Sequence, residues 1–147
     1  MLAIKITIIV FMVLELSNII ALYFKPDFKF ANAVGMFNAW EKTKEDTGIH
    51  DFVRYLVNWV AGTKLIFIAL LTVILIVGNN ETLIYSLAAL IASIITFYFG
   101  LFPLIRKMDK RDEITPKNYS ITLAIMITTF IIAFLAVFLL AIFGVIQ

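Results

Sequence analysis

Two ionisable residues, Glu15 and Lys64, lie inside long apolar stretches of this 147-residue chain, and each has polar neighbours: Ser17 and Asn18 beside the first, Thr63 beside the second. A charged side chain near the centre of a bilayer costs about 2.5–3.5 kcal/mol on insertion scales, so such residues usually face a bundle interior and find a partner. A carboxylate there can exchange a proton or bind a cation, and an ammonium can balance it or receive an anionic group. These residue types predict proton or ion chemistry, or a buried ion pair with a structural role.

The depths of the two charges predict that they meet. Glu15 is ten residues from Lys25, and Lys64 is ten residues from Arg54, two basic residues that we expect near one membrane boundary. At a rise of 1.5 Å per residue, both charges would lie about 15 Å from that boundary if their helices were antiparallel neighbours. Other polar side chains are expected at the same level. The predicted intramembrane polar layer consists of Glu15, Asn18, Thr63, Lys64, Thr96 and Thr128.

Two functions are compatible with this layer. The first is a small oligomeric, ion- or proton-coupled transporter or channel-like module acting on an ion or small solute, because intramembrane carboxylates mark proton and ion routes. The alternative is a non-catalytic accessory or assembly subunit of a larger membrane complex, in which the Glu/Lys pair fixes helix register. Because four helices can hardly enclose a pathway, we expect either a homo-oligomer or a partner membrane protein.

The composition excludes a water-soluble globule. Hydrophobic residues make up 63% of the chain, charged residues 15%, and the mean hydropathy is +1.03, against about 45–50% apolar and about 25% charged residues in soluble domains. There is no cysteine and His50 is the only histidine, which excludes thiol chemistry and multi-histidine metal or haem sites. We expect no cofactor and no metal, and the net charge of +2 gives no indication of a nucleic-acid partner.

An enzymatic role is the least supported interpretation. The segment 106–113 could bind lipid phosphate, or a divalent cation through Asp109, Asp112 and Glu113. Opposite charges three residues apart are, however, typical of a solvated helix face. No nucleophile elbow or phosphate-binding loop is present.

Four apolar stretches must position these residues. Each is long enough to cross a hydrocarbon core of about 30 Å as a helix. We therefore predict an all-α integral membrane protein, a four-transmembrane-helix antiparallel bundle forming a single membrane domain over 1–147. The expected spans are about 2–24, 53–77, 82–105 and 118–146, joined by loops about 25–52 and 106–117 and by a turn about 78–81.

The basic residues predict the orientation of this bundle. Each of the two longer loops, with its flanks, carries five Lys or Arg residues, whereas the opposite side has only Lys5. By the positive-inside rule, both charged loops are cytoplasmic and both termini are external. The sequence thus predicts a multi-pass cell-membrane protein whose first partner is the lipid bilayer.

The long first loop contains aromatic and apolar residues at helical spacing. They are Phe30, Val34, Phe37 and Trp40. This spacing predicts a cytoplasmic amphipathic interfacial helix between spans one and two. Such a helix would serve as a lipid-interface anchor or as a docking or gating element.

Small residues recur at intervals of three and four in the last two spans, which favours close helix packing. We expect the two sets to face each other as one helix-packing seam. The predicted seam comprises Ser86, Ala89, Ser93 and Gly100 in span three with Ser120 and Ala124 in span four.

Overall fold

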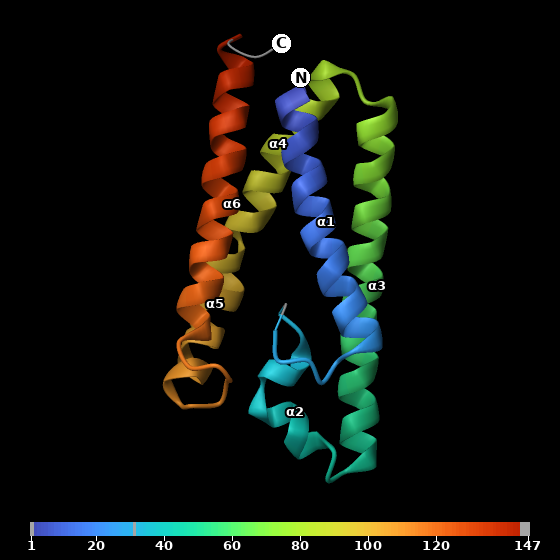
Figure 1. Cartoon of the computed structure of the whole chain (residues 1–147), viewed down its shortest axis with the longest axis vertical. Helices are drawn as coiled ribbons and strands as arrows, with labels where there is room; N and C mark the ends of the chain where they lie inside the picture. Colours follow the sequence, from blue (N-terminus) through green and yellow to red (C-terminus); the bar gives the residue numbers. More distant parts are fainter. Residues whose placement is uncertain (1, 31, 145–147) are drawn as a thin grey trace.

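The chain forms an all-α bundle in a computed structural model that describes residues 2–30 and 32–144. Four long apolar helices pack antiparallel, with a short helix between the first two, which confirms the predicted fold class (Figure 1). The elements are α1 (Leu2–Phe24), the 3₁₀ turn η1 (Val34–Met36), α2 (Asn38–Thr43), α3 (Thr47–Val77), α4 (Asn80–Ile95), α5 (Phe97–Lys110) and α6 (Tyr119–Ile142).

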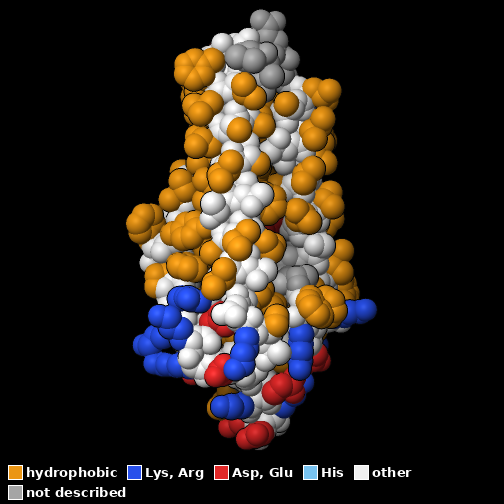
Figure 2. Space-filling model, turned by 60° about the vertical axis from the view of Figure 1, so that its left-hand side comes forward, with side chains coloured by type: hydrophobic (Ala, Val, Ile, Leu, Met, Phe, Trp, Pro, Cys, Tyr) orange, Lys and Arg blue, Asp and Glu red, His pale blue; other side chains and the backbone are white. Residues whose placement is uncertain are grey.

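Four helical stretches are long and apolar enough to cross a membrane: Leu2–Phe24, Thr47–Val77, Asn80–Lys110 and Tyr119–Ile142. Figure 1 places both ends of the chain at one end of the bundle and the two longer loops at the other. Figure 2 shows a broad apolar belt with Lys, Arg, Asp and Glu side chains gathered at the loop end, which we call the charged end. The protein is therefore a polytopic membrane protein.

Helix α3 begins earlier than the second span was expected to. The Asp46 side chain accepts a hydrogen bond from the Ile49 amide at 3.1 Å and so caps the helix at Thr47. The first turns of α3 thus extend past the apolar stretch, beside α2. Because polar residues precede the apolar run, hydropathy alone could not predict this extension.

The third span is broken at Thr96, between α4 and α5. The Thr96 amide donates to Ser93 O at 3.2 Å and the Phe99 amide donates to Thr96 O at 3.1 Å, so the chain tightens into i to i+3 bonding at this point. Farther along α5, Pro103 has no amide proton for the helical ladder. This break lies level with the predicted polar layer.

The half of the bundle near the termini has an apolar core. Ile4, Ile8 and Phe134 are fully buried there, together with Leu83 and Leu87 from α4. Close apolar packing in this core joins α1, α4 and α6. Between helices in a bilayer, van der Waals packing of this kind is a main favourable term for association.

The core is closed toward the middle of the bundle by aromatic rings that meet edge to face. The Phe11 ring centroid lies 5.4 Å from Phe134, 5.6 Å from Phe130 and 6.2 Å from Phe67. Edge-to-face pairs at these distances are favourable beyond their area burial.

At the charged end the two loops pack against each other. Residues Phe37 and Ile114 form an antiparallel bridge, in which the Asn38 amide donates to Glu113 O at 2.9 Å and the Thr115 amide donates to Met36 O at 2.8 Å. A small apolar cluster lies beneath this bridge: Met36, Ile105, Ile114, Tyr119 and Leu123. The loops therefore form one folded layer rather than two independent connections.

The residues predicted to form one interfacial helix are divided: Phe30 lies in a bend, Val34 in η1, Phe37 at the bridge to Ile114 and Trp40 in α2. Phe30 is exposed, whereas Trp40 is buried and its indole Nε1 donates to Asp27 Oδ1 at 2.7 Å. A Cβ on Gly35 would lie 2.4 Å from the Asp27 backbone, so the chain crosses itself here at a distance only glycine permits. The segment folds back on itself, which spacing alone could not distinguish from a continuous helix.

Candidate functional site

The two intramembrane charges meet between α1 and α3. The Lys64 ammonium donates to Glu15 Oε2 at 2.8 Å and to Asn18 Oδ1 at 2.6 Å. Glu15 and Asn18 are three residues apart and so lie on one face of α1. The ammonium is thus held by a carboxylate and an amide oxygen from one neighbouring helix.

The polar contacts continue from α1 to the first loop and to α6. The Asn18 amide nitrogen donates to Asn32 O at 3.2 Å, and the Tyr119 hydroxyl donates to Asn32 Oδ1 at 2.9 Å. Since Lys64 can only donate, Asn18 must present its oxygen to Lys64 and its NH₂ group to Asn32, as observed. Asn32 has φ of 54°, a left-handed conformation that asparagine tolerates better than most residues.

This chain of contacts lies against a cavity of about 630 Å³ between the helices. Most of its wall is apolar, and Glu15 and Lys64 each keep 29% of their side-chain surface exposed. Its polar lining residues are Glu15, Ser17, Asn18, Asn32, Lys64, Ser93 and Thr96. A cavity of this size that is lined by several polar groups can hold water or a small solute.

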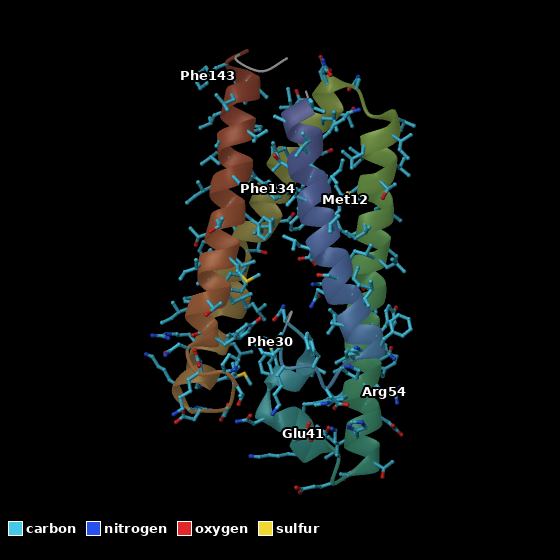
Figure 3. The ribbon with its side chains drawn as sticks, in the orientation of Figure 1. Met12, Phe30, Glu41, Arg54, Phe134 and Phe143 are labelled. Atoms are coloured by element: carbon cyan, nitrogen blue, oxygen red, sulfur yellow. The ribbon has the colours of Figure 1, made fainter. Side chains whose placement is uncertain are left out.

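The cavity ends on an aromatic wall in one direction and on the first loop in the other. Phe11 and Phe130 line it toward the termini, where they pack against Phe134. Asn32 lines it toward the charged end. Figure 3 labels Phe134 on α6, nearer the termini, and Phe30 in the first loop, nearer the charged end.

The structure brings four of the six predicted layer residues to this cavity: Glu15, Asn18, Lys64 and Thr96. Thr63 is instead exposed and donates to Trp59 O at 3.0 Å, because consecutive helical residues point about 100° apart. Thr128 lies in a separate groove between α5 and α6, where its hydroxyl bonds Ala124 O at 2.8 Å and pairs with the Tyr98 hydroxyl.

The small residues predicted to form one seam line different spaces in the structure. Ser86, Ala89 and Ser93 line a shallow groove of about 220 Å³ against α3. Gly100 lines the central cavity, and a Cβ built on it would meet nothing within 4 Å. Helix α4 instead presents Leu83, Leu87 and Leu90 to the buried cluster that contains Phe134.

The remaining two seam residues, Ser120 and Ala124, are used in other ways on α6. The Ser120 side chain bonds Asp109, and the Ala124 carbonyl accepts a hydrogen bond from the Tyr98 hydroxyl at 2.9 Å.

A second polar site, at the start of α6, was not predicted from the sequence. The Asp109 carboxylate is buried and accepts from the Asn118 and Ser120 amides at 3.0 Å each, and from the Ser120 hydroxyl. The Arg106 guanidinium lies 4.0 Å away and donates to Ser120 Oγ at 3.2 Å. Asp109 thus caps α6 from nine residues upstream, too far for a local capping pattern to reveal it.

A third polar cluster fastens the first loop. Asp27 Oδ1 accepts from the Lys44 ammonium and from the Trp40 indole, each at 2.7 Å, and the Trp40 and His50 rings are 4.6 Å apart. The hydrogen bonds from Lys44 and Trp40 lower the pKa of Asp27 below its ordinary value, and the bond to Asp27 raises the pKa of Lys44. The sequence offered only the helical spacing of Trp40 as a signal.

Within residues 2–30 and 32–144, no group of three or more His, Asp or Glu side chains is arranged to hold a metal ion. Comparison with known proteins finds no matching family model, no similar curated protein and no similar solved structure. The functional argument therefore rests on the geometry of the polar groups and the cavity.

Proposed function

We propose that this protein is a small ion- or proton-coupled membrane transporter whose solute site is the central cavity and whose coupling group is Glu15. The observation that supports this function most strongly is that the Glu15–Lys64 pair lines the 630 Å³ cavity instead of being packed shut. An ion pair with a purely structural role does not require a cavity beside it. Intramembrane carboxylates that face cavities typically belong to proton and ion routes.

The geometry provides a simple means of coupling. With Glu15 ionised, its charge is balanced by Lys64 at 2.8 Å. A proton that passes from cavity water to the Glu15 carboxylate removes this balance, and Lys64, still held by Asn18, is then free to bind an anionic group. A cationic solute would act in the opposite way, by competing with Lys64 for the carboxylate.

The orientation predicted by the basic loops makes the charged end cytoplasmic. The Asn32 segment then separates the cavity from the cytoplasm, and the Phe11 cluster separates it from the outside. Transport requires the two barriers to open in turn. We place the opening motions at the first loop and at the break near Thr96, and we expect a second copy of the chain to complete the lipid-shielded wall.

A proton-flux assay tests this function. The protein is reconstituted in liposomes with a potassium gradient and valinomycin, and internal pH is followed with a fluorescent dye. We expect wild-type protein to dissipate the imposed potential by proton movement and Glu15→Gln to lose this flux while keeping its helix content. The matched control is Glu81→Gln, on the exposed first turn of α4. Undiminished flux in Glu15→Gln would refute the proposal.

A second function, an accessory or assembly subunit of a larger complex, is favoured by one observation. The contacts from Lys64 through Asn18 and Asn32 to Tyr119 fasten α1, α3, the first loop and α6 together. In that case the double variant Glu15→Met/Lys64→Met should fold and assemble, whereas each single variant leaves an unpaired charge and should not. Copurification with a larger complex would support this alternative.

A further inference from the structure

The outer face of α5 carries a positive charge that is only partly compensated. Arg106, Lys107, Lys110 and Arg111 lie on one side of the helix and, with Phe102 and Pro103, line a hollow of about 460 Å³. Arg111 lies 3.8 Å from Glu113. Across the residues that the structure describes, no acidic group lies within 4 Å of the Lys107 or Lys110 ammonium.

Among these four cations, the one buried acid on this helix lies within 4.0 Å only of Arg106 and does not reach the two lysines. Asp109 is turned toward α6, where two backbone amides and the Ser120 hydroxyl occupy its oxygens, and its side chain is only 3% exposed. Arg106 is its nearest cation, at 4.0 Å. Figure 2 shows blue side chains gathered at the border of the apolar belt, which is where lipid headgroups lie.

An apolar groove leads away from the same cations along the bundle. It has a volume of about 390 Å³, lies between α5 and α6, and shares Phe102 and Arg106 with the basic hollow. Ile121 and Ile125 form part of its wall. The hydroxyls of Thr128 and Thr129 in this groove donate to carbonyls of their own helix at 2.8 Å, so neither needs a hydrogen-bond acceptor from a ligand.

We propose that this face binds one anionic glycerophospholipid, with its phosphate against Arg106, Lys107 and Lys110 and one acyl chain in the groove between α5 and α6. A phosphate oxyanion accepts charge-assisted hydrogen bonds from all three side chains in either kind of lipid. Charge complementarity selects an anionic over a zwitterionic headgroup, because these cations repel the positive group that a zwitterionic headgroup also carries. The groove distinguishes a lipid from free phosphate, which has nothing to place there. This inference is independent of the transport proposal, since the central cavity lies on the other side of α5.

The test is native mass spectrometry of the delipidated protein titrated with phosphatidylglycerol or phosphatidylcholine. We expect preferential phosphatidylglycerol binding that falls about fivefold per lysine removed, the equivalent of about 1 kcal/mol each, in Lys107→Gln/Lys110→Gln. The matched control is Lys25→Gln/Lys29→Gln, which removes two exposed lysines from the same end of the bundle but outside the hollow. An equal loss in the control would overturn the proposal by showing general surface attraction.

A groove-filling variant, Thr129→Phe, separates lipid from other occupants. It should weaken phosphatidylglycerol binding while leaving competition by inorganic phosphate unchanged. If Thr129→Phe has no effect and inorganic phosphate displaces the ligand fully, the hollow is a free-phosphate site. If the variant instead dissociates a dimer while phosphatidylglycerol remains bound, the groove belongs to a second copy of the chain. Either result overturns the lipid proposal.

Discussion

Lys64 contacts Asn18 at 2.6 Å, closer than its 2.8 Å contact with its charged partner Glu15. The amide oxygen therefore holds the ammonium in place independently of the carboxylate. It is also the point at which the ion pair connects to the rest of the molecule, because the same side chain donates to Asn32 O. Loss of the Glu15 charge thus need not release Lys64 from the cavity wall. The proposed coupling requires Lys64 to stay there.

Replacement of Asn18 by alanine should destabilise the bundle more than an ordinary surface change. Lys64 would lose one acceptor and Asn32 O would lose a donor, and a buried polar group left without its partner costs about 1–3 kcal/mol. The free energy of unfolding, measured by denaturant titration in bicelles, reports this loss. Asn58→Ala, at an exposed position on α3, is the matched control and should change the stability by less than about 0.5 kcal/mol.

Replacement of Gly35 by alanine should disrupt the fold of the first loop. Its new Cβ would lie 2.4 Å from the carbonyl carbon and oxygen of Asp27, and backbone atoms cannot move aside as a flexible side chain can. We expect Trp40 to lose its buried environment, with a red-shifted fluorescence maximum. Gly100→Ala has open space at its Cβ and should instead stabilise α5 by about 0.5–1 kcal/mol. Unchanged Trp40 emission in Gly35→Ala would contradict the crossing.

The architecture and the central pair were predictable because hydropathy and depth depend on residue order along single helices. Glu15 and Lys64 are each ten residues from a basic residue expected near one boundary, so antiparallel packing of α1 and α3 was enough to bring them together. Which face each residue occupies depends on how its helix is rotated about its own axis. The rotation of α3 places Thr63 outside the cavity. Depth alone does not determine rotation.

The polar contacts at the charged end were not predictable from local spacing. Asn32 meets Tyr119 across 87 positions, and Asp109 reaches Ser120 only because the loop after α5 turns back. The helical spacing of the aromatic residues in the first loop predicted one helix. A chain divided into separate short segments, including η1 and α2, satisfies the same spacing. Long-range docking of two loops leaves no periodic signal in either one.

The contacts of Asp27 predict a specific pH response of the first loop. Hydrogen bonds from Lys44 and Trp40 hold the pKa of Asp27 below its usual value of about 3.9. Because the folded-state pKa is depressed, the stabilisation is present above the usual pKa and is lost as pH falls through the lowered value. The transition of the Trp40 indole proton resonance that reports Asp27 should therefore come only below about pH 4, separate from any change caused by the His50 ring, which lies 4.6 Å from Trp40.

The same resonance provides the control for this titration. In Lys44→Gln the first cause of the shift is absent, so the midpoint should move upward toward the usual carboxyl value. A wild-type midpoint at or above that value would show that the Lys44 and Trp40 contacts do not persist in solution.

Asp109→Asn should loosen the start of α6 without changing the shape of the side chain. The carboxylate accepts from the Asn118 amide on one oxygen and from the Ser120 amide and hydroxyl on the other, whereas an asparagine side chain offers only one accepting oxygen. Hydrogen bonds to charged groups contribute about 1.5–3 kcal/mol, so we expect a loss of that size. Faster hydrogen exchange at the Ser120 amide, measured by NMR, would report it. The control Asp112→Asn removes only an exposed ion pair with Lys117, 2.9 Å apart, and should cost at most about 1 kcal/mol.

If the Ser120 amide exchanges at the same rate in both variants, Asp109 does not cap α6. The α5 face would then carry one more negative charge than the lipid proposal assumes.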